Sequence, residues 1–196
     1  MFSFLRTLFR HTPPTDDTRK LFPQYAIGIE TYGNPKVFTW GSDSKLTIGS
    51  YCSIGGDVQI LLGGNHRIDW VSTFPFPARW PEAAGIPGHP ATKGNVTIGH
   101  DVWIGRQSVI LSGVSIGTGA VIGCNSIVGS DVPAYTIAAG NPARPIRQRF
   151  PDAIVNRLLA SHWWELSREQ LAAHLHLLCD TDIEAFLAAV ESIVIT

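Results

Sequence analysis

The sequence predicts a mainly β protein built as a β-helix of six-residue repeats, and three observations support this. An unbroken six-residue period runs from residue 98 to residue 133, as IGHDVW-IGRQSV-ILSGVS-IGTGAV-IGCNSI-VGSDVP. The first position of each repeat is a bulky aliphatic residue, namely Ile98, Ile104, Ile110, Ile116, Ile122 and Val128. The fifth position is smaller, namely Val102, Ser108, Val114, Ala120, Ser126 and Val132. Self-similarity at a fixed short period is typical of repeat architectures.

The length of the period excludes an α-helix, whose 3.6-residue turn would spread the aliphatic residues around its circumference. Six residues fit short strands separated by sharp corners, with coils stacked about 4.8 Å apart so that each strand hydrogen-bonds to the next. The glycine at the second position of most repeats is expected to adopt corner conformations that other residues resist. Another β architecture with the same period is the alternative.

The N-terminal segment, residues 1–24, precedes the repeats. Phe2 to Phe9 is expected to form a short amphipathic helix that docks on its own protein, with contact to a membrane surface as the alternative. Arg6 and Arg10 interrupt the apolar stretch and no small-residue cleavage site follows, so we do not interpret it as a signal peptide. Proline and aspartate in residues 11–24 predict a loop.

The β-helix is predicted for residues 25–149. The six-residue rule first appears at Ile48, Ile54 and Ile60, with Cys52 and Val58 at the fifth position. The spacing between this group and the repeats that start at residue 98 is not a multiple of six. An insertion must therefore leave the coils between the two groups.

This insertion, the arm, comprises residues 63–95 and contains two Trp, two Phe, five Pro and two His. A loop of this length in a compact domain is usually functional or disordered, and the aromatic residues argue against disorder. We expect the arm to project from the coils and to pack on a neighbour.

The C-terminal tail, residues 150–196, has a helical pattern. A last strand is predicted from Thr136 to Ala139 just before it. One helix is expected from residue 151 to the His-Trp-Trp sequence at residues 162–164. A capping box, Ser167 with Gln170, opens a second helix that runs to residue 178, and a third is expected over residues 180–194. We expect the tail to cap the end of the β-helix and to protect its open edge.

Composition restricts the classes of function. The 196 residues carry a net charge of −1, which gives no indication of nucleic acid or of an anionic membrane as partner. No segment approaches the roughly 20 apolar residues that span a bilayer. Cys52, Cys124 and Cys179 have no metal-site spacing and are odd in number, so we expect no metal and a reducing, cytoplasmic setting.

His66 is the candidate for catalysis that the residues themselves suggest. It lies in GGNHR, where the periodic coils stop and the arm begins. An imidazole that titrates near neutral pH suits a general base accepting a proton from a hydroxyl. A single loop histidine is also compatible with a surface position that has no function. His89, in GHPATKG, is a second acid/base group or a residue without a role in catalysis.

Several motifs together resemble the xenobiotic acetyltransferases, a group that includes the class B chloramphenicol and the streptogramin A acetyltransferases. The resemblance covers residues 25–149 and, more loosely, HWWEL in the tail. The motifs are LTIGSYCSIGGDVQI, GGNHRIDWVSTFPF, KGNVTIGHDVWIG, VSIGTGAVIGCNSIV and GNPAR. The arm motif is particular to this group, whereas DVWIG and GNPAR also occur in hexapeptide acetyltransferases of sugars and serine.

The resemblance implies a left-handed parallel β-helix, a homotrimer with sites between subunits, acetyl-CoA as donor and a small-molecule hydroxyl as acceptor. It places the catalytic histidine on His66. The residues implied for acetyl-CoA are Trp103, Arg106, Gly113, Cys124, Gly129, Arg144 and Arg147, the last two as candidates for the 3′-phosphate. The residues implied for the acceptor are Tyr32, Asn65, Asp69 and Trp70. A backbone N–H near Gly113 is expected to bind the oxyanion.

The sequence departs from the group at three places. His100 stands where the group mostly has Asn, Arg106 where a small residue is common, and residues 76–93 match poorly. The acceptor is therefore an antibiotic or a sugar of a surface polysaccharide. Three further alternatives are a zinc enzyme of the carbonic-anhydrase type, a scaffold without catalysis, and a mechanism with Cys124 as nucleophile.

Overall fold

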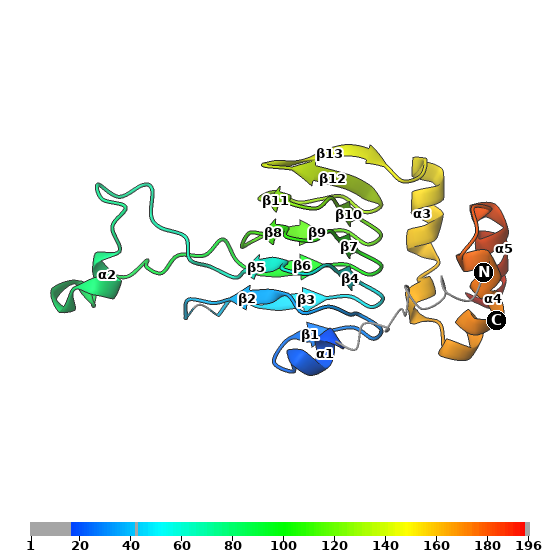
Figure 1. Cartoon of the computed structure of the whole chain (residues 1–196), viewed down its shortest axis with the longest axis horizontal. Helices are drawn as coiled ribbons and strands as arrows, with labels where there is room; N and C mark the ends of the chain where they lie inside the picture. The colour runs from blue at the N-terminus through cyan, green and yellow to red at the C-terminus, as the bar shows by residue number, and fades with distance from the viewer. Residues whose placement is uncertain (1–16, 42, 195–196) are drawn as a thin grey trace, which may run out of the picture.

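The computed structural model describes residues 17–41 and 43–194, so the helix expected over Phe2 to Phe9 lies outside the described residues. Three sheets stack side by side into a left-handed β-helix (Figure 1). Each coil visits the three sheets in the same order, and successive coils pair in parallel with matched register, as in Ile48 with Ile98 and Ile98 with Ile116. The predicted fold class is confirmed.

We number the faces of this prism in the order in which the chain meets them. Face 1 contains β1 (Ala26–Ile27), β3 (Leu46–Ile48), β6 (Val96–Ile98) and β9 (Ser115–Ile116). Face 2 contains β4 (Ser53–Ile54), β7 (Trp103–Ile104), β10 (Val121–Ile122), β12 (Thr136–Gly140) and β13 (Ala143–Gln148). Face 3 contains β2 (Lys36–Phe38), β5 (Gln59–Leu61), β8 (Val109–Ile110) and β11 (Ile127–Val128). Each corner is named by the two faces that it joins.

The interior of the prism is filled as the repeat predicts. The aliphatic residues at the first position are buried, and so are the residues at the fifth position, Cys52 and Val58 among them. Ser108 and Ser126 are buried as well, and both hydroxyls donate to the carbonyl of Gly123, at 2.9 and 2.7 Å. Removal of each large aliphatic side chain from water contributes about 1.5–3 kcal/mol, so this column is the main source of stability.

The predicted reason for the repeat glycines is wrong. Left-handed backbone conformations occur two residues after these glycines, at Tyr51, Asp101, Gln107 and Asn125 among others. The glycines instead allow the coils to stack closely. A Cβ on Gly105 would lie 2.5 Å from the backbone nitrogen of Cys124, and Gly49, Gly99 and Gly117 have similar backbone neighbours, whereas Gly129 meets only a side chain at 3.4 Å. Contact between backbones, rather than backbone freedom, requires glycine there.

The last coil ends in a way that the sequence did not predict. The expected strand at residues 136–139 is β12, but the chain then reverses at residues 141–142 and β13 pairs with β12 in antiparallel orientation. This strand, and not the helical tail as predicted, covers the open edge of face 2. Gly140 and Pro142 therefore make a hairpin turn rather than the end of the sheet.

The tail lies elsewhere than predicted. Its helices, α3 (Asp152–Ala160), η3 (Trp163–Glu165), α4 (Arg168–Leu178) and α5 (Ile183–Val194), run beside the coils at the 1–2 corner (Figure 1). Tyr51 of that corner contacts Trp163, with ring centroids 5.5 Å apart, and Tyr135 belongs to the same buried cluster. The predicted capping box of Ser167 and Gln170 is confirmed. No helix within the described ranges is long and apolar enough to cross a membrane.

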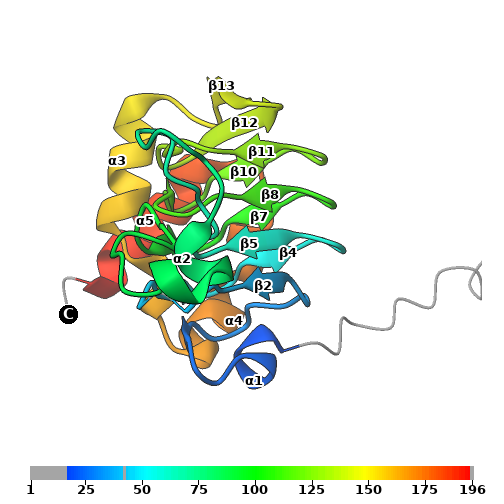
Figure 2. The ribbon, with the colours of Figure 1, turned by 90° about the vertical axis from the view of Figure 1, so that its left-hand side faces the viewer.

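The N-terminal side of the stack carries α1 (Thr18–Leu21) beneath the first coil (Figure 1). The arm leaves the 3–1 corner after β5 and returns at β6, and it carries α2 (Phe76–Arg79) and η2 (Pro81–Ala83). It projects away from the coils on the side opposite the tail helices, and in Figure 2 it points toward the viewer.

Candidate functional site

The base of the arm is held by a small set of contacts. Asn65 and Ala91 exchange two backbone hydrogen bonds, at 3.0 and 3.1 Å, across an antiparallel bridge. The side-chain amide of Asn65 donates to the hydroxyl of Ser112 at 2.9 Å, which ties the arm to the 3–1 corner. Gly64 lies against the Trp40 ring, where a Cβ would be 2.8 Å away. The outgoing and the returning segments of the arm are therefore held together directly before His66.

His66 has a defined tautomer in this setting. Its Nδ1 lies 2.7 Å from the backbone carbonyl oxygen of Thr73. A carbonyl only accepts hydrogen bonds, so Nδ1 carries the hydrogen, and the neutral ring holds its free lone pair on Nε2. The side chain is exposed, so that this nitrogen belongs to an accessible imidazole. The sequence contained no signal for Thr73, because a backbone carbonyl acts here and not a side chain.

The other arm residues predicted to bind the acceptor have local partners. Arg67 donates from Nε to Asp69 at 2.7 Å and lies 5.2 Å from the centroid of the Trp70 ring. The guanidinium holds the pKa of the Asp69 carboxyl at about 2, mainly through hydrogen bonding. Asn65 is engaged with Ser112 as described. These side chains shape the arm around His66, and the polar groups of Asn65 and Asp69 already have partners.

Face 2 presents two exposed aromatic residues in one column. Trp103 is 58% exposed and pairs in register with Ser53, which in turn is bridged to Tyr32, 38% exposed. Residues in one column of a parallel sheet repeat at about 4.8 Å, so Tyr32 and Trp103 lie two coils apart, roughly 10 Å. The structure thus brings together a residue predicted for the acceptor and one predicted for acetyl-CoA.

The remaining candidates on the coils lie at two corners that border face 3. Arg106 and Cys124 occupy the 2–3 corner in successive coils, and Arg106 donates to Asp57 at 3.3 Å. The Cys124 thiol is exposed, and it has no histidine partner in the part of the chain that the structure describes. The thiol of Cys52 is buried, which raises its pKa to about 11, and this excludes it as a nucleophile.

Gly113 and Gly129 lie at the 3–1 corner beside the arm. The N–H of Gly113 donates to the carbonyl of Gly94 at 3.1 Å, and a Cβ on Gly113 would lie 2.7 Å from Lys93. The N–H of Gly113 itself therefore already has an acceptor, and the expectation of an oxyanion donor near Gly113 stays a prediction for another N–H. The glycine instead permits the returning end of the arm to approach the coil.

Arg144 and Arg147 lie on β13 and are exposed. Each guanidinium donates to a backbone carbonyl, at 3.1 and 2.9 Å, and neither forms an ion pair within the described ranges. Two guanidinium groups without carboxylate partners at one end of face 2 fit an anionic group such as a phosphate.

One chain does not bring these candidates into a single site. The arm with His66 leaves the 3–1 corner, whereas Trp103 faces outward from face 2, which is the face opposite that corner. Figure 1 shows the arm extending away from the coils rather than folding back over them. A site that contains both residues requires a second copy of the chain.

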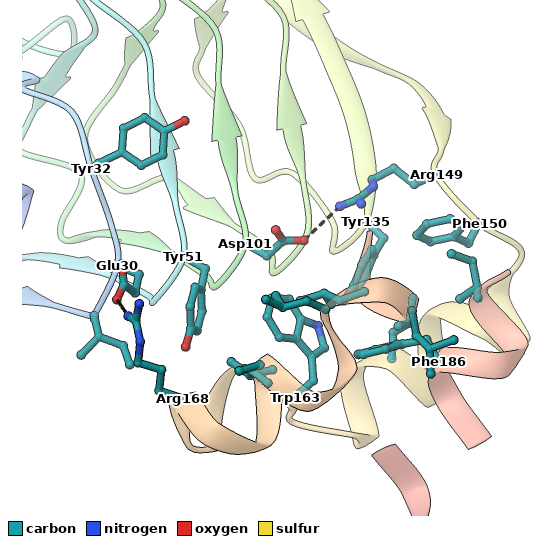
Figure 3. Close-up of a pocket in the computed structure, with 18 residues that line it drawn as sticks. Glu30, Tyr32, Tyr51, Asp101, Tyr135, Arg149, Phe150, Trp163, Arg168 and Phe186 are labelled. Atoms are coloured by element: carbon teal, nitrogen blue, oxygen red, sulfur yellow. Dashed lines mark hydrogen bonds and ion pairs between the residues drawn. The ribbon is translucent and has the colours of Figure 1, made fainter. Parts of the chain in front are cut away.

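A cavity of about 630 Å³ lies between the 1–2 corner and the tail helices (Figure 3). Its walls are mainly apolar, and they include an ion pair of Arg149 with Asp101 at 3.3 Å and the Tyr135 ring under the guanidinium. Burial raises the pKa of the Asp101 carboxyl, although the Arg149 guanidinium opposes this. Tyr32 also lines the cavity. The arm and His66 lie on the other side of the stack, and no sequence motif had indicated this cavity.

His100 has a structural role. The Nδ1 of His100 accepts the backbone N–H of Ser50 at 3.0 Å, and the ring stacks on Trp164 at 4.8 Å. His100 thus joins the 1–2 corner to the tail rather than facing His66. In the described residues, no three His, Cys, Asp or Glu side chains are grouped as a metal site would require.

Comparison with known proteins agrees with this architecture. The family described as "Bacterial transferase hexapeptide (six repeats)" matches residues 95–130. A chloramphenicol acetyltransferase of Klebsiella aerogenes is 44% identical over 143 residues, covering 71% of this chain and 68% of the relative. A virginiamycin A acetyltransferase of Staphylococcus aureus is 41% identical over 148 residues, covering 71% and 65%.

A solved structure is also similar. A hexapeptide-repeat-containing acetyltransferase of Vibrio cholerae, complexed with acetyl coenzyme A, is 29% identical with a TM-score of 0.50, covering 64% of this chain and 60% of that one. The fold and the relatives define the class: the chain is a hexapeptide-repeat acetyltransferase. Within that class it belongs to the chloramphenicol and virginiamycin A acetyltransferase group.

Proposed function

We propose that this acetyltransferase moves the acetyl group of acetyl-CoA to a hydroxyl of an antibiotic-like small molecule, with His66 as general base. The observation that carries the proposal is the hydrogen bond from Nδ1 of His66 to the Thr73 carbonyl, which leaves Nε2 as the basic nitrogen of an accessible ring. A base placed in this way contributes about 10²–10⁴-fold to the rate.

The proton and the electrons balance with no covalent enzyme intermediate. Nε2 of His66 takes the proton as the acceptor oxygen attacks the thioester carbonyl carbon, and a carbon–oxygen bond forms. When the carbon–sulfur bond breaks, the imidazolium returns the proton to the leaving thiolate. The oxyanion donor must be an N–H other than that of Gly113, which is already bonded to Gly94.

The donor substrate is assigned to the coils. Trp103 offers an exposed aromatic face for the thioester end, and the 2–3 and 3–1 corners supply Arg106, Cys124, Gly113 and Gly129 along the pantetheine. Arg144 and Arg147 are assigned to the 3′-phosphate, since both guanidinium groups lack carboxylate partners in the described chain. The Vibrio cholerae relative that was solved with acetyl coenzyme A supports the choice of donor.

The active unit is proposed to be a homotrimer with each site between two subunits. His66 and Trp103 lie on opposite sides of one chain, so the site is incomplete without a second copy. The arm also exposes apolar side chains, among them Phe74 at 47% and Trp80 at 55%, whose rings both contact Phe76, and grouped apolar exposure of this kind marks an interaction surface. The unpaired cysteines fit a reducing compartment, and we therefore place the trimer in the cytoplasm.

The acceptor is tested with purified protein, acetyl-CoA and three acceptors, with thiol release and acceptor mass as readouts. We expect chloramphenicol or virginiamycin A to gain one acetyl group, as the names of the relatives suggest. A galactoside O-acetyltransferase of Escherichia coli K12, 31% identical over 156 residues, makes a sugar the second candidate. Acetylation of a galactoside alone would replace the antibiotic with a sugar.

The phosphate assignment has its own test. Arg147→Ala should weaken CoA binding by about tenfold to a hundredfold, because a charged hydrogen bond is worth about 1.5–3 kcal/mol. Dephospho-CoA should bind both proteins alike. Titration calorimetry measures the four dissociation constants, for CoA and dephospho-CoA with the parent and the variant protein. Arg19→Ala on α1 is the control for a change in overall charge. An equal loss for both ligands would remove Arg147 from the 3′-phosphate.

A further inference from the structure

The arm holds a second imidazole that the proposed mechanism does not use. The rings of His66 and His89 meet edge to face, with centroids 5.3 Å apart and an interplanar angle of 87°. Both ring nitrogens of His89 are buried, and neither has a hydrogen-bond partner in the described part of the chain. A buried polar atom without a partner usually costs about 1–3 kcal/mol, so its retention needs an explanation.

The backbone of the arm places the two rings together. His66 directly follows Asn65 and His89 lies two residues before Ala91, and Asn65 and Ala91 form the bridge at the base of the arm. Gly88, with φ of +105°, brings the returning chain against Arg67, where a Cβ would lie 2.9 Å from the guanidinium. The outgoing and returning segments of the arm are therefore in close contact beside the two histidines, and the His89 ring has little room to move.

His66 needs a second restraint besides its hydrogen bond. The side chain turns about its Cα–Cβ and Cβ–Cγ bonds, and the bond from Nδ1 to the Thr73 carbonyl is the one hydrogen bond that restrains it in the described residues. Such rotation would move Nε2, and a displacement of about 1 Å in a reacting group can reduce a rate by about 10²-fold. A ring placed edge to face against the imidazole blocks this rotation.

We propose that His89 is a positioning residue whose ring, and not its nitrogens, holds the His66 imidazole in its reactive orientation. This inference rests on the proposed function of His66 as base. It explains why both nitrogens of His89 lack partners: the side chain acts through its shape and its contact with the neighbouring ring.

The test compares three substitutions at this position in the full-length protein. His89→Ala should lower kcat about tenfold to a hundredfold, with KM for acetyl-CoA within about twofold, because the donor is bound on the coils. His89→Phe restores a ring and should recover most of kcat. His89→Leu restores volume without a ring and should not. His176→Ala, on the exposed side of α4, is the control and should match the parent protein.

Three outcomes would overturn the role of His89, and a fourth would refute the role of His66. Wild-type kcat for a folded His89→Ala protein overturns the inference, and so does a His89→Phe protein as slow as His89→Ala, since the nitrogens would then be required. If His89→Ala does not fold, equal rates for the Phe and Leu proteins overturn it instead. A fully active His66→Ala protein would refute the proposed base itself, whatever the substitutions at position 89 show.

Discussion

The coils and the arm are stabilised in different ways. In the coils, each interior position is filled by one column of the repeat, and the aliphatic side chains are almost completely buried. In the arm, Ala83 is the single buried hydrophobic side chain, and its shape depends on a bridge, a few side-chain hydrogen bonds and stacked rings. Stability thus resides in the coils, whereas the candidate base resides in the arm. A scaffold with a repeated core can carry a variable arm, because the arm contributes little to folding.

The largest effect expected from this difference is on catalysis. His66→Ala should reduce acetyl transfer by about 10²–10⁴-fold, while the melting temperature and the proposed trimer stay unchanged, because the exposed ring has no part in the core. Steady-state kinetics and size-exclusion chromatography measure the two properties. Unchanged turnover would show that the base lies elsewhere, and loss of the trimer would show that the arm is more important to assembly than the contacts of His66 imply.

A smaller effect is expected at the corner glycines of the coils, where two neighbours form a matched pair. A Cβ on Gly55 would lie 2.7 Å from the backbone nitrogen of Arg106, whereas a Cβ on Gly56 would meet nothing within 4 Å. Gly55→Ala should therefore lower the free energy of unfolding by about 1–3 kcal/mol, the usual range for overpacking. Gly56→Ala should be close to neutral. Denaturant titration of both proteins checks this, and equal stabilities would refute the stacking explanation.

The smallest effect is a pH dependence where the tail meets the coils. Burial lowers the pKa of His100, with His162 acting in the same direction and Glu165 opposing them. The folded state therefore favours neutral His100, so its contribution is complete above about pH 6.5 and is lost as the pH falls through the folded pKa.

The measurement is the free energy of unfolding of the parent protein and of His100→Asn on both sides of that value. The difference between the two proteins should shrink in acid, because only the parent carries this histidine. A difference that is constant with pH would mean that His100 does not titrate in this range, and the stacking on Trp164 would then be its whole contribution.

The sequence predicted the coils well because each feature is local and repeated six times. The register of Ile98 with Ile116 follows directly from the period, and that of Ile48 with Ile98 follows because both occupy the first position of a repeat on either side of the arm. The reason for the glycines was wrong, since the period shows that a small residue is needed but not which neighbour requires it. The antiparallel β13 was missed because Pro142 suggests a break and a hairpin equally well.

The arm was less predictable because its contacts join residues far apart in sequence. The motif predicted His66 as the catalytic residue. It did not predict the Thr73 carbonyl that fixes the His66 tautomer, or the Ser112 hydroxyl that accepts the hydrogen bond of the Asn65 side chain. The predicted position of the tail, at the end of the β-helix, was also wrong. Apolar residues in a helix show that it packs on something, and Tyr51 and Tyr135, which receive it, lie in coils whose sequence gives no sign of an outward contact.

The antiparallel β13 has a consequence for the solution behaviour of the protein. A stack of identical coils would otherwise end in a row of unpaired amides that could recruit another molecule and grow into a fibre. Here the final strand reverses direction, carries a proline that offers no N–H, and sets two arginines at the boundary. Growth along face 2 at this end is opposed by geometry and charge together, so a chain shortened before residue 143 should self-associate more readily.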